Sequence, residues 1–444
     1  MPSIIIMNNA TEQMLGRNLN ASQAMFAAKA AMRNVWLAYP GDVIVSLARL
    51  DPEFEAYLSH ALGTVAGEVS IVRPDVAEGV VLGDAYLRDA GLFERLKAAI
   101  GDAPDWCLDP CYHTRGVALL RQALGLPKGP GHRLALEHGT DLFNRKSHFR
   151  QLAAASGLPL PEGAIALSAS DFAEMVTRLL PVTAKVIVKL DNGAGGTGNF
   201  VLSAEQCGPQ AGACETLVLD RGDPEGLSKI WSRLQSAASG PVVVEAYHPA
   251  TQMFYLEYLI APDGAAQFVN SGTIRLRAHD DPAAPDLFWV GLELPAQLPS
   301  GMLAKACAEA ELLLATVAAL GYRGPINIDA IVTLDGHLLF NECNGRWGGG
   351  TVLHEIGKRL IGAEFAASHV VASLRDLPSP GFAPLLALLE NAGLLFDPAK
   401  GHGSCVLACD DDMSHSFEAV VIANSPKAAR QLEAQLVAAL GAAR

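Results

Sequence analysis

The chain has 444 residues, half of them hydrophobic, and its 33 basic and 47 acidic side chains give a net charge of −14. This length is typical of about three domains, each large enough to bury a core. The acidic balance argues against a nucleic-acid or anionic-membrane surface, which needs a basic excess. No apolar run reaches the ~18 residues of a membrane span, and the first residues lack the basic region and cleavage site of a signal peptide. We therefore expect a cytoplasmic protein with reduced cysteines.

The first part of the chain alternates predicted strands and helices. Strands are predicted at 4–7, 42–47 and 69–72, and helices at 21–39 and 52–62. This alternation favours a parallel sheet with helices packed on it. No glycine-rich turn follows the first strand, so this part is not expected to hold a pyrophosphate. We expect a structural α/β domain over residues 1–129, which ends where glycine and proline are dense.

The rest of the chain divides at a second cluster of prolines. A mixed α/β stretch covers residues 130–374, and prolines at 378, 380 and 384 follow it. The last segment, 375–444, predicts two strands and a helix, a small α+β domain.

A glycine-rich loop follows an apolar strand that ends in Lys189. Glycines at 193, 195, 196 and 198 separate this strand from a second one. Glycine allows positive φ and carries no side chain, so successive N–H groups can point at one anion. A P-loop would require a helix after the glycines, so the pattern favours a hairpin lid over phosphates. A plain hairpin is the alternative, but it leaves a costly unpaired lysine in an apolar strand.

The segment 324–346 predicts two strands joined by a tight turn at Asp335-Gly336. Alternation along the strands gathers polar side chains on one face, namely Asn327, Asp329, Glu342, Asn344 and Arg346. The turn is about midway between Asp329 and Glu342, so their carboxylates can lie side by side. Two carboxylates and a carboxamide are hard oxygen ligands suited to Mg²⁺. The alternative is a solvated polar face, which the apolar residues between them disfavour.

Three further segments are informative only in combination. The apolar residues 241–244 lead into Glu245, and a helix is predicted from Lys146 to Gly157. A lysine near a helix start opposes the helix dipole unless an anion lies there, and an ordinary surface lysine is the alternative. Three glycines at 348–350 precede another predicted helix, whose N-terminus could receive a substrate anion; a flexible turn is the alternative.

Four elements follow one another over about residues 130–374: the helix from Lys146, Lys189 with its glycine loop, Glu245, and the carboxylate hairpin of 324–346. Together, in this order, they resemble the ATP-grasp superfamily. The stretch from Tyr39-Pro40-Gly41 is similar to the pre-ATP-grasp domain of peptide ligases of the pheganomycin type, and the tail to their small extra domain. The resemblance implies an α/β fold with a pre-ATP-grasp domain, an ATP-grasp domain with a lid over about 183–246, and a small C-terminal α+β domain.

The resemblance implies roles for individual residues. ATP would be bound by Lys146, Lys189, Gly195, Gly196, Thr197, Gly198, Glu245, Ala246, Tyr247 and His248, with the backbone of Ala246 and His248 at the adenine edge. Two Mg²⁺ ions, for which Mn²⁺ can substitute, would be bound by Asp329, Glu342 and Asn344. Arg346 would face an acyl phosphate.

The sequence departs from the superfamily pattern at Asn327, where many of these ligases have an arginine. Transition-state charge must then be met elsewhere, and Arg275 and Arg277 share a face of a predicted strand. A pair of surface arginines is an equally weighted alternative. The ribose ligand stays open between Gln252 and Glu257.

The resemblance implies an ATP-dependent ligase that activates a carboxylate as an acyl phosphate and joins it to an amine. ADP and phosphate would be released, and the substrates would be amino acids, peptides or similar small molecules of specialised metabolism. A homodimer is one assembly compatible with this expectation. Two alternatives stay open: other ATP-grasp chemistry such as carboxylation, and a nucleotide-binding regulatory protein without turnover.

Overall fold

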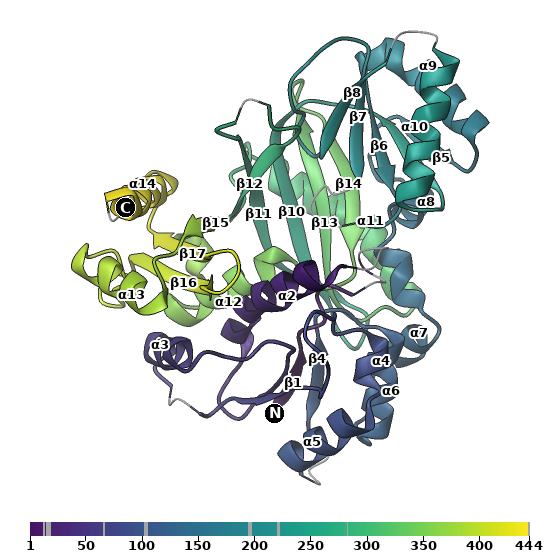
Figure 1. Ribbon diagram of the computed structural model, residues 1–444. Helices are drawn as coiled ribbons and strands as arrows, with labels where there is room; N and C mark the ends of the chain where they lie inside the picture. Colours follow the sequence, from purple (N-terminus) through teal and green to yellow (C-terminus); the bar gives the residue numbers. More distant parts are fainter. Residues whose placement is uncertain are drawn as a thin grey trace.

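The computed structural model describes residues 1–11, 14, 19–64, 67–101, 105–193, 198–219, 223–281 and 283–442. These residues build three sheets, with an N-terminal sheet below a large central sheet and a smaller sheet beside its upper end (Figure 1). In the described part of the chain, no helix is both long and apolar enough to span a bilayer.

The N-terminal sheet is entirely parallel and has the order β3-β2-β1-β4. Its strands are β1 (Ser3–Ile6), β2 (Val43–Val45), β3 (Ser70–Val72) and β4 (Cys107–Pro110). Its helices are α2 (Ala21–Ala30), α3 (Pro52–Leu62), α4 (Asp84–Leu87), α5 (Ala90–Ile100) and α6 (Arg115–Ala123). The predicted parallel α/β unit is confirmed. The single helix predicted over 21–39 is instead α2 followed by the 3₁₀ helix η1 (Ala31–Leu37), and the backbone is extended at Ala38, ahead of Pro40.

The smaller sheet, which we call the lid sheet, has the order β5-β9-β6-β7-β8. Its strands are β5 (Gly163–Ala166), β6 (Lys185–Leu190), β7 (Asn199–Ser203), β8 (Glu215–Val218) and β9 (Val242–Ala246). Helices α9 (Ala169–Thr183) and α10 (Pro224–Ala237) cover it, because both bury an apolar stripe against the strands. The β6–β7 hairpin predicted around the glycine loop is confirmed, with Lys189 opposite Asn199.

The central sheet has eight strands in the order β14-β13-β10-β11-β12-β15-β17-β16. They are β10 (Ala250–Ile260), β11 (Ala266–Ala278), β12 (Leu287–Leu294), β13 (Gly324–Thr333), β14 (Leu338–Asn344), β15 (Val370–Pro378), β16 (Gly403–Asp410) and β17 (Ser416–Ala423). Helices α8 (Lys146–Ala155) and α11 (Met302–Ala319) bury apolar side chains against one end of it. Helix α12 (Gly349–Leu360) packs with β11, β12 and β15.

The C-terminal strands continue this sheet rather than forming one of their own. The predicted boundary at 374/375 falls within β15, which pairs with β12 on one side and β17 on the other. Helices α13 (Phe382–Asn391) and α14 (Pro426–Ala442) lie over this end of the sheet, at the left in Figure 1. The two strands and the helix predicted for the tail are therefore present.

Contacts with the N-terminal sheet fix both ends of the central sheet. Lys29 on α2 forms an ion pair of 2.8 Å with Asp410 on β16. At the other edge, just after β14, the N–H group of Trp347 donates to the carbonyl oxygen of Cys111, at 3.1 Å, and Tyr112 forms a β-bridge with Arg346. The short helices α7 (His132–Leu136) and η2 (Gly139–Phe143) connect the two parts, and η3 (Phe365–Ala367) follows α12.

Candidate active site

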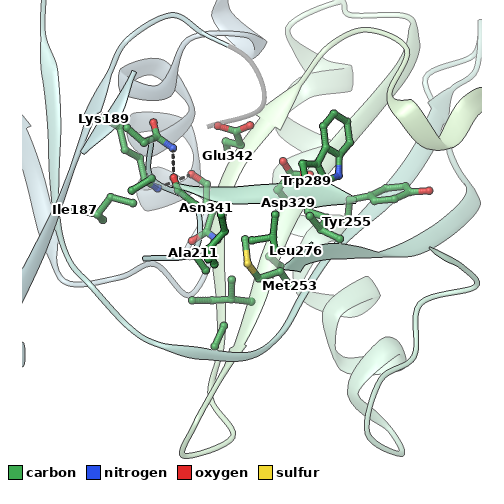
Figure 2. Close-up of a pocket in the computed structure, with 18 of the residues that line it drawn as sticks. Ile187, Lys189, Ala211, Met253, Tyr255, Leu276, Trp289, Asp329, Asn341 and Glu342 are labelled. Carbon is green, nitrogen blue, oxygen red and sulfur yellow. Dashed lines mark hydrogen bonds between the residues drawn. The ribbon is translucent and has the colours of Figure 1, made fainter. Parts of the chain in front are cut away.

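A cavity of about 380 Å³ lies between the lid sheet and the central sheet (Figure 2). Its volume is in the range of small-molecule sites. One end is lined by β6, β9 and the segment that follows β9, including Ile187, Lys189 and Glu245. The other end is lined by β11, β12 and the start of α12. The polar face of the β13–β14 hairpin lies between them, with Asn327, Asp329, Glu342, Asn344 and Arg346.

The β13–β14 hairpin brings its two carboxylates together as predicted. Asp329 lies directly opposite Glu342, and Asn327 directly opposite Asn344. Burial and the Glu342 carboxylate raise the pKa of Asp329 well above its ordinary value. Burial would raise the pKa of Glu342 too, but the positive charges of Lys146, Lys189 and Arg346 lower it. Further positive charge beside the pair would favour its ionised form.

Lys146 lies at the start of α8, and the predicted start of this helix is confirmed. Its ammonium is buried, 3.5 Å from the Glu342 carboxylate and 3.4 Å from the Gly193 carbonyl oxygen. The anion expected at this helix start is a side chain of the protein itself, because Asp191 Oδ1 accepts from the N–H group of Ser147 at 2.9 Å. Sequence reasoning missed Asp191, although it follows Lys189 by two residues.

Lys189 and Glu245 form a buried ion pair across the lid sheet. Lys189 Nζ is 2.7 Å from Glu245 Oε2 and 3.3 Å from the Asn341 carbonyl oxygen on β14. The other Glu245 oxygen is 2.5 Å from Arg150 on α8. Arg150 also donates to the carbonyl oxygens of Pro161 and Gly163, so it ties α8 to the lid sheet. Sequence reasoning missed Arg150, because only the fold brings it next to Glu245.

The segment after β9 offers backbone groups to the same end of the cavity. Ala246, Tyr247 and His248 all line it. The N–H of Ala246 donates to the Glu162 carbonyl oxygen, and that of Tyr247 to the Lys185 carbonyl oxygen. No described residue accepts a hydrogen bond from the N–H of His248. Of these three N–H groups, that of His248 is therefore the one available to a ligand.

The glycine loop lies mostly outside the described residues, and this includes Gly195, Gly196 and Thr197. Its two described ends have positive φ, 134° at Gly193 and 91° at Gly198. The Gly198 carbonyl oxygen accepts from the Leu190 N–H at 2.9 Å, which closes the hairpin behind the loop.

Arg346 follows β14 and points its guanidinium at the carboxylate hairpin. It donates to Asn344 Oδ1 at 2.7 Å, and its buried Nε has no partner among the described residues. Asn327, in the position noted as unusual, donates to the Arg346 carbonyl oxygen at 2.9 Å. The carboxamide thus fixes the backbone of the arginine and does not supply a charge.

The structure corrects the expectation for Arg275 and Arg277. They share a face of β11, but the cavity is lined by their neighbours Ile274 and Leu276, which point the other way. Arg275 pairs with Glu433 on α14 at 2.6 Å, and Arg277 with Asp280 in an exposed loop. Neither arginine reaches the cavity, because strand parity showed which residues share a face but not which face is inward.

The two ribose candidates do not line the cavity either. Glu257 is fully buried on β10, where it accepts from Asn270 at 2.6 Å and from the Thr351 hydroxyl group on α12. Burial raises its pKa. Glu257 therefore holds the start of α12 in place through Thr351. Gln252 lies at the outer end of β10, near the Asp335 turn.

The glycines before α12 give the backbone close access to the cavity. Gly348, Gly349 and Gly350 line it, and a Cβ at Gly350 would lie 1.8 Å from the Tyr255 hydroxyl oxygen. The first turn of α12 carries no acidic side chain. An anion at this helix start, expected from the glycine triplet, stays a prediction.

The donor set fits a magnesium nucleotide. Among the described residues, no group of three or more His, Cys, Asp and Glu side chains is arranged to hold a metal ion by itself. The hairpin offers two carboxylates and a carboxamide, which leaves coordination positions for phosphate oxygens and water, as Mg²⁺ prefers. A divalent cation would also supply the positive charge that the Asp329–Glu342 pair lacks.

Comparisons with known proteins agree with this architecture. Residues 31–126 match the family model of the Pre ATP-grasp domain, and residues 384–436 that of the PGM1 C-terminal domain. L-propargylglycine–L-glutamate ligase from Streptantibioticus cattleyicolor is 24% identical over 336 residues, which cover 72% of this chain. The match spans 64% of the length of that relative.

Two solved structures resemble the whole chain. The ADP complex of an N5-carboxyaminoimidazole ribonucleotide synthetase has a TM-score of 0.57 and 13% identity, over 98% of this chain and 97% of the other. An L-amino acid ligase from Bacillus licheniformis has a TM-score of 0.51 and 14% identity, with the same coverage of both chains. These likenesses show the fold, and the expected α/β architecture with a pre-ATP-grasp domain is confirmed.

Proposed function

We propose that this chain, which has the ATP-grasp fold behind a pre-ATP-grasp domain, is an ATP-dependent ligase that activates a carboxylate as an acyl phosphate and joins it to an amine. Peptide or amide bond formation with release of ADP and phosphate is the reaction we favour. The relative from Streptantibioticus cattleyicolor, named as a ligase of two amino acids, supports this class of substrate.

One observation carries the proposal. The Asp329–Glu342 pair, Lys189 and Arg346 line a single cavity, and Lys146 lies 3.5 Å from the Glu342 carboxylate. Such an arrangement is suited to phosphoryl transfer, in which catalysis is mostly positioning and neutralisation of charge.

The proposed roles follow from the contacts. Lys146 and Lys189 bind ATP phosphates, and the His248 N–H meets the adenine edge beside Glu245. Asp329, Glu342 and Asn344 would hold magnesium, which would supply positive charge for the transferring phosphoryl group. The substrate carboxylate attacks the γ-phosphorus in line, which forms the acyl phosphate and releases ADP.

The second step, attack of the amine on the acyl phosphate, takes place in the same cavity. The amine attacks the acyl carbon, and phosphate leaves from the tetrahedral intermediate. Arg346, with its unpartnered Nε, faces the acyl phosphate and stabilises the negative charge that develops there. The lid sheet covers the cavity on one side, which limits hydrolysis of the acyl phosphate. A substrate carboxylate group is received at the start of α12.

Two alternatives are distinguished by experiment. Carboxylation would consume bicarbonate, and a regulatory nucleotide-binding protein would bind ATP without turnover. The complete set of Asp329, Glu342, Asn344 and Lys189 argues against the second, because a pure binder need not keep two metal sites.

The test is release of ADP and phosphate from Mg-ATP across a matrix of carboxylic acids and amines, with products identified by mass spectrometry. We expect a product lighter by one water than the two substrates combined, formed only when both are present. Tight ATP binding without turnover on any pair would refute the ligase, and turnover that requires bicarbonate would favour carboxylation.

A further inference from the structure

The cavity has an apolar end that the nucleotide and metal roles do not use. Its side chains come from the β11–β12 hairpin and face the cavity together, and we call them the apolar wall: Ile274, Leu276, Leu287, Trp289 and Leu292. Leu276 pairs directly with Trp289 across the hairpin, and Ile274 with Leu292. Such cross-strand neighbours form one continuous surface.

The wall is apolar but not closed off from the cavity. Of its five members only Leu292 is fully buried, while the other four keep part of their surface toward the cavity. Asp286 is the one charged side chain of this hairpin among the described lining residues, and it is paired with His279 at 3.0 Å. No free charge of the hairpin therefore faces the wall.

Trp289 is held in a fixed position. Its indole N–H donates to the Gly291 carbonyl oxygen at 3.2 Å, and the Arg375 guanidinium lies 4.4 Å from its ring centroid. The polar atom of the ring is thus satisfied within the protein. What the ring offers to a ligand is apolar surface.

The distance between the apolar wall and the carboxylate hairpin matches the length of a small acid. Asp329 pairs with Tyr255 on β10, and Tyr255 with Gly272 on β11. Two strand spacings, roughly 10 Å, therefore separate Asp329 from β11. Figure 2 shows Trp289, Leu276 and Tyr255 on the side of Asp329 away from Lys189. A small acid can span this gap with its carboxylate toward Arg346 and its side chain on the wall.

We infer that the carboxylic acid activated by this protein carries an uncharged, apolar side chain, which packs on the apolar wall. This inference rests on the proposed function and names the class of its carboxylate substrate. Binding is favoured when an apolar side chain leaves water and packs on this wall. A charged side chain would have to leave its hydration shell for a wall that offers no partner.

The test isolates the carboxylate substrate by using hydroxylamine as the amine. Hydroxylamine attacks an acyl phosphate at its acyl carbon, which gives a hydroxamate and releases phosphate. With Mg-ATP we expect leucine, valine and phenylalanine to form hydroxamates with kcat/KM at least about tenfold above aspartate, glutamate or lysine.

Two variants assign the selectivity to the wall. Leu276→Asp should lower kcat/KM for leucine by about tenfold or more while the KM for ATP stays unchanged. The control Leu259→Asp places the same charge on an exposed position of β10 and should change neither value. Leu276→Met keeps an apolar surface and should retain activity. Lower activity of Leu276→Asp would then be caused by the charge and not by the absence of leucine.

The outcomes distinguish the inferred substrate class from the proposed ligase function. Hydroxamates formed equally well from aspartate or lysine would overturn the apolar substrate class and leave the ligase standing. Absence of hydroxamate from every acid, with ATP bound, would refute the ligase and the inference together. Unchanged selectivity in a folded Leu276→Asp protein would show that the wall does not bind the side chain.

Discussion

The hydroxyl group of Tyr255 occupies the space that a side chain at Gly350 would need, 1.8 Å from the position of its Cβ. The hydroxyl is held there by a hydrogen bond of 2.8 Å to Asn270, which in turn donates to Glu257. Glu257 accepts from Thr351, so one polar network fixes the first turn of α12. The position of the helix N-terminus in the cavity depends on this network.

We expect Gly350→Ala to destabilise the protein by about 1–3 kcal/mol, because the methyl group forces Tyr255 away from Asn270. Alanine would gain up to about 1 kcal/mol in helix propensity, which is too little to offset the clash. Urea denaturation measures the difference. Gly129→Ala, where nothing lies within 4 Å, is the control. Equal stability of the two variants would show that Tyr255 can move freely.

Replacement of Glu342 tests the metal site. Glu342→Gln keeps the volume of the side chain but removes one charge, so we expect a folded protein whose ATP turnover falls by about 100-fold or more. Circular dichroism and thermal denaturation check the fold. Glu390→Gln, at an exposed position of α13, should leave turnover unchanged. Full activity of Glu342→Gln would end the assignment of this residue as a metal ligand.

Replacement of Lys189 tests phosphate binding. We expect Lys189→Met to raise the Kd for ATP by about tenfold, because one charge-assisted contact is lost. Glu245 keeps its ion pair with Arg150, so the lid sheet should still fold. Calorimetry gives the affinity, with the exposed Lys229→Met on α10, the helix that covers the same sheet, as the control. Equal ATP affinity in both variants would exclude Lys189 from the binding site.

Arg150 should matter more for stability than Lys189 does. Arg150→Ala removes the ion pair with Glu245 and both hydrogen bonds to the segment at 161–163. Breaking a buried pair of this kind costs about 3–5 kcal/mol. Denaturation of Arg150→Ala beside Lys189→Met gives the comparison, and a smaller loss for the arginine variant would contradict this ranking.

The pH dependence of stability should show whether Asp109 on β4 is protonated in the folded protein. Burial, with the charge of Asp42, raises its pKa to about 6, although a hydrogen bond from Trp347 acts against this. The folded form therefore holds a proton that the unfolded chain, with a pKa near 3.9, releases. This stabilisation is complete below about pH 4 and is lost as the pH rises through 6, by about 2–3 kcal/mol.

Asp109→Asn tests this relationship, because asparagine cannot release a proton. We expect the variant to match the wild type at pH 4 and to be more stable than it at pH 7. Urea midpoints at the two values give the difference, with the exposed Asp105→Asn as the control. A constant gap between wild type and Asp109→Asn across this range would show that Asp109 does not titrate there.

Sequence patterns predicted the parts of the structure that depend on residues close together in the chain. The Asp335-Gly336 turn and the alternation around it predicted that Asp329 and Glu342 lie side by side, and a register shift between Asp329 and Ala330 places the two directly opposite each other. The helix start at Lys146 was equally readable. In both cases the residues that decide the geometry lie within a few positions of each other.

Sequence reasoning failed where the partner is distant or where the direction of a face matters. Arg275 was assigned to the reacting phosphate, but its partner Glu433 is 158 positions further along the chain. Glu257 was a ribose candidate, and only the packing of α12 shows that it is buried. The apolar wall was missed because two alternating strands look like ordinary core strands until the cavity beside them is known.

The bridge between Tyr112 and Arg346 has a consequence for how the protein is made. These residues are far apart in the sequence, and contacts of such long range tend to form late in folding. Arg346 is therefore set in place only after the N-terminal sheet and the carboxylate hairpin have met. A newly synthesised or partly unfolded chain would therefore lack the part of the cavity lining that Arg346 supplies.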